Sequence, residues 1–208
     1  MTNLAVAYRK AKKPDKALLL SQESLTKRKV VLGSKHPDTI TSKNNLGILL
    51  LDLKDTNKAV SLLEETLADR REVLGQEHPE TLSTMSNLAQ GYEASGQFEQ
   101  AEEMYRQSIA AKERVLGRLH PSVLLGIYNF AQNYRGRKQM DAAVPLFEEV
   151  LARGTERKDG LPSNLGDLPE MMVNVYQEAN RLEDCESHAI SRLADYEKRL
   201  GATAQETL

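Results

Sequence analysis

Apolar residues along the chain recur at every third or fourth position, the spacing that places them on one face of an α-helix. Residues 79–92 carry such a face, the segment Ser95-Gly96-Gln97 interrupts it, and residues 98–116 carry a second one. Pro79 suits the first turn of a helix, and Gly117 is the residue type that commonly follows a helix end. No segment of useful length alternates between apolar and polar residues, as a half-buried strand would. The pattern predicts a pair of helices and no strand.

This helical pair recurs with a period of 42 residues. A His-Pro pair stands at residues 36, 78 and 120, with Leu-Gly four residues before each histidine and an asparagine nine residues after it. A small residue and a large residue each hold one position through five periods. The two sets are Ala17, Ala59, Ala101, Ala143 and Cys185, and Tyr8, Leu50, Tyr92, Tyr134 and Tyr176. Such repetition indicates a solenoid, in which each unit buries its apolar face only against its neighbours.

We therefore expect an all-α fold of about five helical hairpins, with ten helices in a single domain over residues 1–200. The expected repeats are residues 1–33, 34–75, 76–117, 118–157 and 163–200, followed by a flexible tail at 201–208. The first repeat lacks an opening turn before Asn3, which suggests a fragment of a longer array. In the last repeat, Asp167 followed by Pro169 predicts a first helix that begins late and is short.

The repeat resembles the tetratricopeptide repeat. The family pattern of a large residue, a small residue and an aromatic, then Ala-x3-Phe on the second helix, is present twice in close form. It reads Leu88-Ala89-x2-Tyr92 with Ala101-x3-Tyr105, and Phe130-Ala131-x2-Tyr134 with Ala143-x3-Phe147. The longer, 42-residue period resembles the repeats of kinesin light chain and of arrays attached to large signalling ATPases and kinases. The resemblance implies an α-solenoid wound as a right-handed superhelix, with the first helix of each repeat lining a concave groove.

Composition argues against several classes of partner. The chain has 28 Lys+Arg against 30 Asp+Glu, a net charge of -2 and a pI of about 6.1, so neither nucleic acid nor an anionic membrane is expected as a partner. No stretch approaches the roughly 18 apolar residues of a membrane span. The single Cys185 cannot form an internal disulfide, and we expect a reducing, cytoplasmic location.

No catalytic residue, cofactor site or metal site is predicted. Equivalent residues in stacked repeats lie about 8–10 Å apart, so His36, His78 and His120 cannot converge on one zinc ion, and each is expected to cap or pack at its own loop. The sequence has no Gly-rich phosphate loop, HExxH, GxSxG or paired-cysteine motif. We expect a protein that is not an enzyme.

The asparagine that follows each His-Pro pair is the main candidate for binding. In the family, an asparagine at this position bonds the main chain of an extended peptide, and an amide group offers both donors and an acceptor for that purpose. The alternative is that the asparagine bonds the helix of the neighbouring repeat and holds the stack together. The candidate groove residues are Asn45, Asn87 and Asn129, with Asn44, Gln90, Tyr128, Gln132, Arg135 and Asn174 on the same face.

The sequence thus predicts a scaffold that binds a protein or peptide partner in its groove, through a mixed or near-neutral segment held largely by main-chain contacts. The alternative is a structural or sensor segment of a larger signalling ATPase or kinase, or an array that self-associates end to end. We expect a monomer or weak self-association. Many partners fit one solenoid fold, so the sequence does not name the partner.

Overall fold

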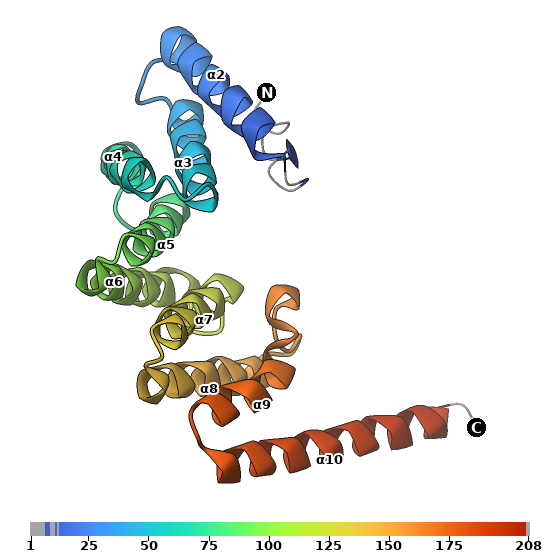
Figure 1. The fold of residues 1–208 in the computed structure, drawn as a ribbon. Coiled ribbons are helices and arrows are strands. Elements are labelled where there is room, and N and C mark those ends of the chain that lie inside the picture. The colour runs from blue at the N-terminus through green and yellow to red at the C-terminus, as the bar shows by residue number, and fades with distance from the viewer. Residues whose placement is uncertain (1–6, 9–10, 12, 207–208) are drawn as a thin grey trace. The chain divides into compact units, whose positions relative to one another are not determined.

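A computed structural model describes residues 7–8, 11 and 13–206, and their side chains up to residue 194. Within these residues the chain forms nine α-helices, one short 3-10 helix and no strand (Figure 1). Contacts divide the chain into two compact units, Met1–Gly117 and Arg118–Leu208, which we call the N-terminal and the C-terminal unit. Each unit is described by itself.

The N-terminal unit is built from successive helical hairpins. Helices α3 and α4 form one hairpin and α5 and α6 form the next, while α2 packs on α3 and α4 packs on α5. The 16-residue first helices α3 and α5 alternate with second helices of 19 residues. The helices are α2 Pro14–Leu32, α3 Pro37–Asp52, α4 Thr56–Leu74, α5 Pro79–Ala94 and α6 Phe98–Leu116.

The C-terminal unit contains one full hairpin and one modified hairpin. Helix α7 packs on α8, α8 on α9, and α9 on α10. Helix α9 has 11 residues and starts after a 3-10 turn, which confirms the prediction of a late, short first helix. The elements are α7 Pro121–Gly136, α8 Met140–Glu156, the 3-10 helix η1 Ser163–Leu165, α9 Leu168–Glu178 and α10 Leu182–Glu206.

Nine of the ten expected helices are therefore present in the described part of the chain. The first expected helix falls on residues 1–12, most of which lie outside that part. At the other end, α10 continues through residues 201–206, which the sequence analysis assigns to a flexible tail. Residues 207–208 lie outside the described part.

The small position of the repeat is buried in the first four repeats. The alanines at residues 17, 59, 101 and 143 are all fully buried. In the hairpins α3–α4, α5–α6 and α7–α8, this small residue lets the second helix approach its first helix closely. Cys185, the fifth residue of the series, is only half-buried, and its thiol lies 3.8 Å from the carbonyl oxygen of Val173. The expected core position is thus partly open at α10.

Each His-Pro pair starts a first helix, as expected. The Nδ1 atoms of His36, His78 and His120 accept hydrogen bonds from the backbone N–H two residues later, at 3.2, 3.2 and 3.1 Å. The proline that follows occupies the first turn, where its missing N–H costs no hydrogen bond. A histidine ring in this role replaces the more common Ser, Asp or Asn cap.

Within the N-terminal unit, consecutive repeats pack against each other through apolar side chains. Leu67 of α4 belongs to the same core cluster as Leu82 and Met85 of α5, the first helix of the next repeat. Leu25, one repeat earlier in the same position, clusters with Leu46 and Leu50 of α3. In α2 and α4, this position of the second helix therefore packs against the first helix that follows it.

An arginine on each of two second helices also bonds the start of the next repeat. The Nη1 atom of Arg28 donates to the carbonyl oxygen of Asp38 at 2.7 Å and to Ser42 Oγ at 2.9 Å. Arg70, 42 residues later, donates to the carbonyl oxygen of Glu80 at 2.7 Å and to Thr84 Oγ1 at 2.6 Å. We call this contact the arginine staple.

Candidate functional site

The first-helix face of the N-terminal unit carries four of the predicted binding residues. Helix α3 contacts α5 directly, so these two first helices lie next to each other. Asn45 of α3 and Asn87 of α5 are half-buried, and Gln90 of α5 is exposed. Asn44 is buried, which removes most of its side chain from contact with a ligand.

Asn44 joins the two repeats instead. Its Oδ1 accepts hydrogen bonds from Asn87 Nδ2 at 3.2 Å and from Thr84 Oγ1 at 3.3 Å. Thr84 is also the hydroxyl that receives the staple of Arg70. Asn87 therefore takes part in the contact between repeats that the sequence analysis considers as the alternative role of this asparagine position. Asn45 makes no side-chain hydrogen bond with any described residue.

The C-terminal unit carries the other predicted residues on α7 and α9. Asn129 is half-buried and, like Asn45, makes no side-chain hydrogen bond within the described residues, while Asn174 is exposed. Gln132 Nε2 donates to Tyr128 Oη at 2.7 Å and lies 3.7 Å from the sulfur of Met171. The ring of Tyr128 packs edge-on against Phe147, with ring centroids 5.7 Å apart. This packing fixes the ring, so Tyr128 presents a defined surface.

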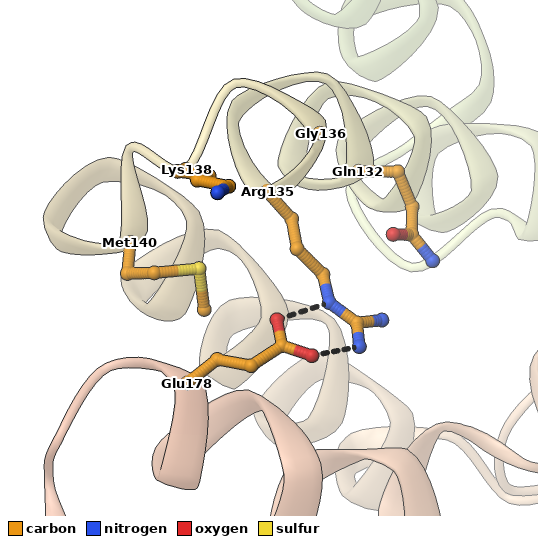
Figure 2. Close-up of a pocket in the computed structure, with 6 residues that line it drawn as sticks. All are labelled: Gln132, Arg135, Gly136, Lys138, Met140 and Glu178. Carbon is orange, nitrogen blue, oxygen red and sulfur yellow. Dashed lines mark hydrogen bonds and ion pairs between the residues drawn. The ribbon is translucent and has the colours of Figure 1, made fainter.

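A pocket of about 570 Å³ lies between the end of α7 and the end of α9 (Figure 2). Arg135 reaches from α7 to Glu178 of α9, with Nε–Oε2 and Nη2–Oε1 distances of 2.8 and 2.6 Å. The pocket is lined by Gln132, Arg135, Gly136, Lys138, Met140 and Glu178, and we call it the α7–α9 pocket.

The ion pair in the α7–α9 pocket holds both of its groups in the charged form. The hydrogen bond from Arg135 lowers the pKa of Glu178, and the same bond raises the pKa of Arg135 against the opposing effect of burial. The pocket contains two cationic side chains and one carboxylate. Lys138 has no ion-pair partner among the described residues.

Two of the predicted groove residues, Gln132 and Arg135, line this pocket, and its other lining residues were not predicted. Glu178 lies four residues after the predicted Asn174, so it falls on the same helix face, and this spacing could have identified it. Lys138 and Met140 belong to the turn and first residues after α7, where helical spacing gives no signal.

A second polar group, unpredicted, is buried between α5 and α6. Lys112 Nζ donates to Ser86 Oγ at 2.7 Å, and Ser86 lies 2.9 Å from Ser108 Oγ. Burial lowers the pKa of Lys112 to about 8. All three side chains are buried, with Lys112 only 7% exposed, so this group belongs to the interior of the hairpin.

The described residues contain no group of three His, Cys, Asp or Glu side chains placed to hold a metal ion. In His36, His78 and His120, Nδ1 already accepts the backbone hydrogen bond that caps the following helix. In the same part of the chain, no helix is long and apolar enough to cross a membrane.

Comparisons with known proteins agree with this architecture. The model of the tetratricopeptide repeat family matches residues 1–72 and 50–114, together more than half of the chain. No curated protein matches the chain. Tetratricopeptide repeats generally mediate protein–protein interaction, and folds of this type are typically non-catalytic.

Three solved structures illustrate the structural similarity. The nearly identical TPR-like repeats assigned to a kinesin light chain of Podosopora anserina are 27% identical, with 95% of this chain and 94% of that chain covered and a TM-score of 0.77. BtubC (BKLC) from P. vanneervenii is 23% identical over 97% of this chain and 78% of that chain, with a TM-score of 0.74. MamA from Desulfovibrio magneticus RS-1, from residue 41 to its end, is 14% identical over 95% and 93%, with a TM-score of 0.57.

The structures of BtubC and MamA show the fold alone. The family model matches the repeats of the N-terminal half, and the repeats from Podosopora anserina are of the same type. The chain therefore belongs to the tetratricopeptide repeat family, in its 42-residue, kinesin-light-chain-like form.

Proposed function

We propose that the chain is a non-catalytic scaffold that binds an extended segment of a partner protein along the first helices of its repeats. Asn45 and Asn129 carry the proposal, because their amide groups are partly exposed and make no hydrogen bond within the described residues. An amide with an available donor and acceptor matches a peptide unit whatever side chain that unit carries. The helices hold these amides in place before binding, so most of the ordering cost falls on the ligand.

The contrast between Asn44 and Asn45 provides the test. We would select a binding peptide from a displayed library on the full chain, and then measure its affinity for Asn45→Ala and Asn129→Ala. Each change should weaken binding about fivefold, the value of one hydrogen bond of about 1 kcal/mol, with no change in urea unfolding.

Asn44→Ala is the matched control. It removes a buried acceptor of two hydrogen bonds, so it should lower the free energy of unfolding by about 1–2 kcal/mol. Unchanged affinity in Asn45→Ala and Asn129→Ala, or loss of stability in both, would contradict groove binding and favour a purely structural role for this position.

End-to-end association is the second candidate, and α10 favours it. Leu182, Ile190 and Leu193 are 65%, 61% and 59% exposed. Leu193 holds the same repeat position as Leu25 and Leu67, which pack against the next first helix. Sedimentation velocity over a concentration range tests this idea, because a chain that stays monomeric at every concentration excludes it. The absence of nucleic-acid and membrane partners and the cytoplasmic location remain predictions.

A further inference from the structure

We propose that Met171 is a site of reversible oxidation by hydrogen peroxide, and that Tyr128 and Gln132 hold the oxygen of the resulting sulfoxide. Tyr128 and Gln132 lie one turn apart on α7, and Met171 lies near the start of α9. The oxidation itself requires no partner protein. Only its effect on partner binding rests on the proposed function.

Two hydrogen-bond donors converge on the Met171 sulfur, although a thioether is a weak acceptor. Tyr128 Oη lies 3.9 Å from Sδ, and Gln132 Nε2 lies 3.7 Å from it. Gln132 also donates to Tyr128 Oη at 2.7 Å, and the sulfur is the one acceptor for the tyrosine O–H among the described residues. A sulfoxide is polar, so its oxygen would accept both hydrogen bonds more strongly than the sulfur does.

The repeat pattern also favours an acceptor at residue 171. Met171 holds the position of Asn87 two repeats later, and Tyr128 holds that of Asn44 in the same way. In the N-terminal unit, Asn87 donates to Asn44 at 3.2 Å and so joins two repeats. The contact between Tyr128 and Met171 is its equivalent, with a thioether in place of an amide. Oxidation would supply the oxygen acceptor that the contact of the N-terminal unit already has.

Met171 is accessible to a small oxidant. It is half-buried, whereas the adjacent Met172 is 0% exposed and belongs to the interior. Met104 and Met140 are half-buried as well, but their sulfurs accept no hydrogen bond from any described residue. The chain therefore carries its own references for the oxidation rate, two methionines without donors and one without access.

The step is a two-electron oxidation of the thioether. A sulfur lone pair attacks one oxygen of hydrogen peroxide, so that the S–O bond forms as the O–O bond breaks. The transferred oxygen gives its proton to the departing hydroxide, which leaves as water. Donors at the sulfur stabilise the negative charge that develops on the transferred oxygen, and they should therefore speed the step. Methionine sulfoxide reductases reverse it.

Oxidation of Met171 should weaken binding of a partner segment to α7. Tyr128 and Gln132 are both predicted groove residues, and the sulfoxide would engage the donors that a peptide needs. Met171→Gln stands in for the oxidised residue, because it places an oxygen acceptor on a side chain of similar length. Met171→Leu is the matched control, because it keeps an apolar side chain that peroxide does not oxidise.

The rate test exposes the full chain to dilute hydrogen peroxide and follows each methionine by peptide mass spectrometry. Met171 should oxidise about fivefold faster than Met104 and Met140, the rate equivalent of one hydrogen bond of about 1 kcal/mol. In Tyr128→Phe this advantage should disappear, while unchanged rates at Met104 and Met140 show that the variant is folded. Equal rates at the three residues in the native chain, or an unchanged Met171 rate in Tyr128→Phe, would overturn the inference.

The binding test measures the affinity of the library-selected peptide before and after peroxide treatment. The oxidised native chain and Met171→Gln should each bind it about fivefold more weakly, whereas treatment should leave the affinity of Met171→Leu unchanged. Unchanged affinity in Met171→Gln would remove the effect on the groove and keep the oxidation site. If the library yields no binding peptide, the proposed function fails, and the rate test still decides the oxidation site.

Discussion

Gly47 shows at the residue scale how the repeat pattern and local packing can disagree. The same position holds Ala89 and Ala131 in the next two repeats, which suggests that alanine is acceptable there. In the structure, a Cβ atom on Gly47 would lie 2.8 Å from the Cγ and Cδ2 atoms of Leu63, a fully buried side chain. Repeats with alanine at this position have Tyr105 or Phe147 in place of the branched Leu63.

Gly47→Ala should therefore destabilise the chain by about 1–2 kcal/mol, the cost of overpacking less the gain in helix propensity. Gly136→Ala is the control, because nothing lies within 4 Å of its added Cβ, and it should stabilise by about 0.5–1 kcal/mol. Urea unfolding of both variants measures the difference. Stabilisation by Gly47→Ala would show that Leu63 moves aside freely.

Lys112 makes stability depend on pH. Its folded pKa of about 8 lies below its ordinary value of 10.5, so between these values the unfolded chain binds a proton that the folded chain lacks. Stability must then rise as pH increases from 8 toward 10, by about 2 kcal/mol at 1.36 kcal/mol per pKa unit. Above pH 10 the opposite effect begins, because burial raises the pKa of Tyr92 and of Tyr176 to about 12.

Chemical unfolding of the native chain and of Lys112→Met at pH 7, 8, 9 and 10 tests this expectation. The variant should be more stable at pH 7, where it avoids a buried ammonium, and should lose the rise above pH 8. If the free energy of unfolding rises equally above pH 8 in both proteins, titratable groups other than Lys112 cause the rise.

At the element scale, α3 and α4 are joined by an ion pair where the next repeats use apolar contact. Lys43 is 1% exposed, and its Nζ donates to Glu65 and, at 2.6 Å, to Asp69. Burial disfavours its charge, but the hydrogen bonds to Asp69 and Glu65 outweigh this effect and raise the pKa of Lys43. Met85 and Ile127 hold the equivalent position in the next two repeats. A buried pair of this kind makes each partner depend on the other.

Asp69→Asn should cost about 2 kcal/mol of unfolding free energy, the value of a charged hydrogen bond. In the double variant Lys43→Met/Asp69→Asn, most of this loss should be recovered, because the buried ammonium is gone. A double-mutant cycle by urea unfolding gives the coupling energy. If the losses of unfolding free energy in Lys43→Met and Asp69→Asn simply add in the double variant, Lys43 and Asp69 are not coupled, and Glu65 alone satisfies Lys43.

Helix bounds were predictable at this scale, and the buried polar contacts were not. The spacing of apolar residues, the His-Pro pairs and the glycines place α5 and α6 in agreement with the structure, because these signals are local. The Arg135–Glu178 pair joins residues 43 apart, and the bond from Lys112 to Ser86 joins residues 26 apart. Such contacts depend on which individual side chains meet between two helices. A repeat pattern describes only what the repeats have in common, so it does not predict these contacts.

At the scale of the whole molecule, each repeat depends on its neighbour for stability. Leu67 and Leu193 hold the same repeat position, but Leu67 is 4% exposed beside α5, whereas Leu193 is 59% exposed. Leu67→Asp should therefore cost at least about 3 kcal/mol, as a charge replaces a core side chain. Leu193→Asp should change stability by no more than about 0.5 kcal/mol.

Thermal unfolding of both variants compares one position in two surroundings. A large loss in Leu193→Asp would mean that another surface covers α10 in solution, and a simultaneous shift in sedimentation would identify that surface as a second copy. Equal small effects in both variants would contradict the shared seam between α4 and α5.

The arginine staple has a consequence for how such a chain can be rearranged in evolution or by engineering. Arg28 and Arg70 each need a hydroxyl fourteen residues later, which Ser42 and Thr84 supply. The repeat of residues 118–157 has Gly126 at that position. If residues 34–75 were duplicated in tandem, Ser42 of the second copy would offer a hydroxyl to Arg70 of the first copy. If residues 118–157 were placed directly after residue 75, Arg70 would meet Gly126 and would have no hydroxyl to bond. Modules of one family are thus interchangeable only in certain orders.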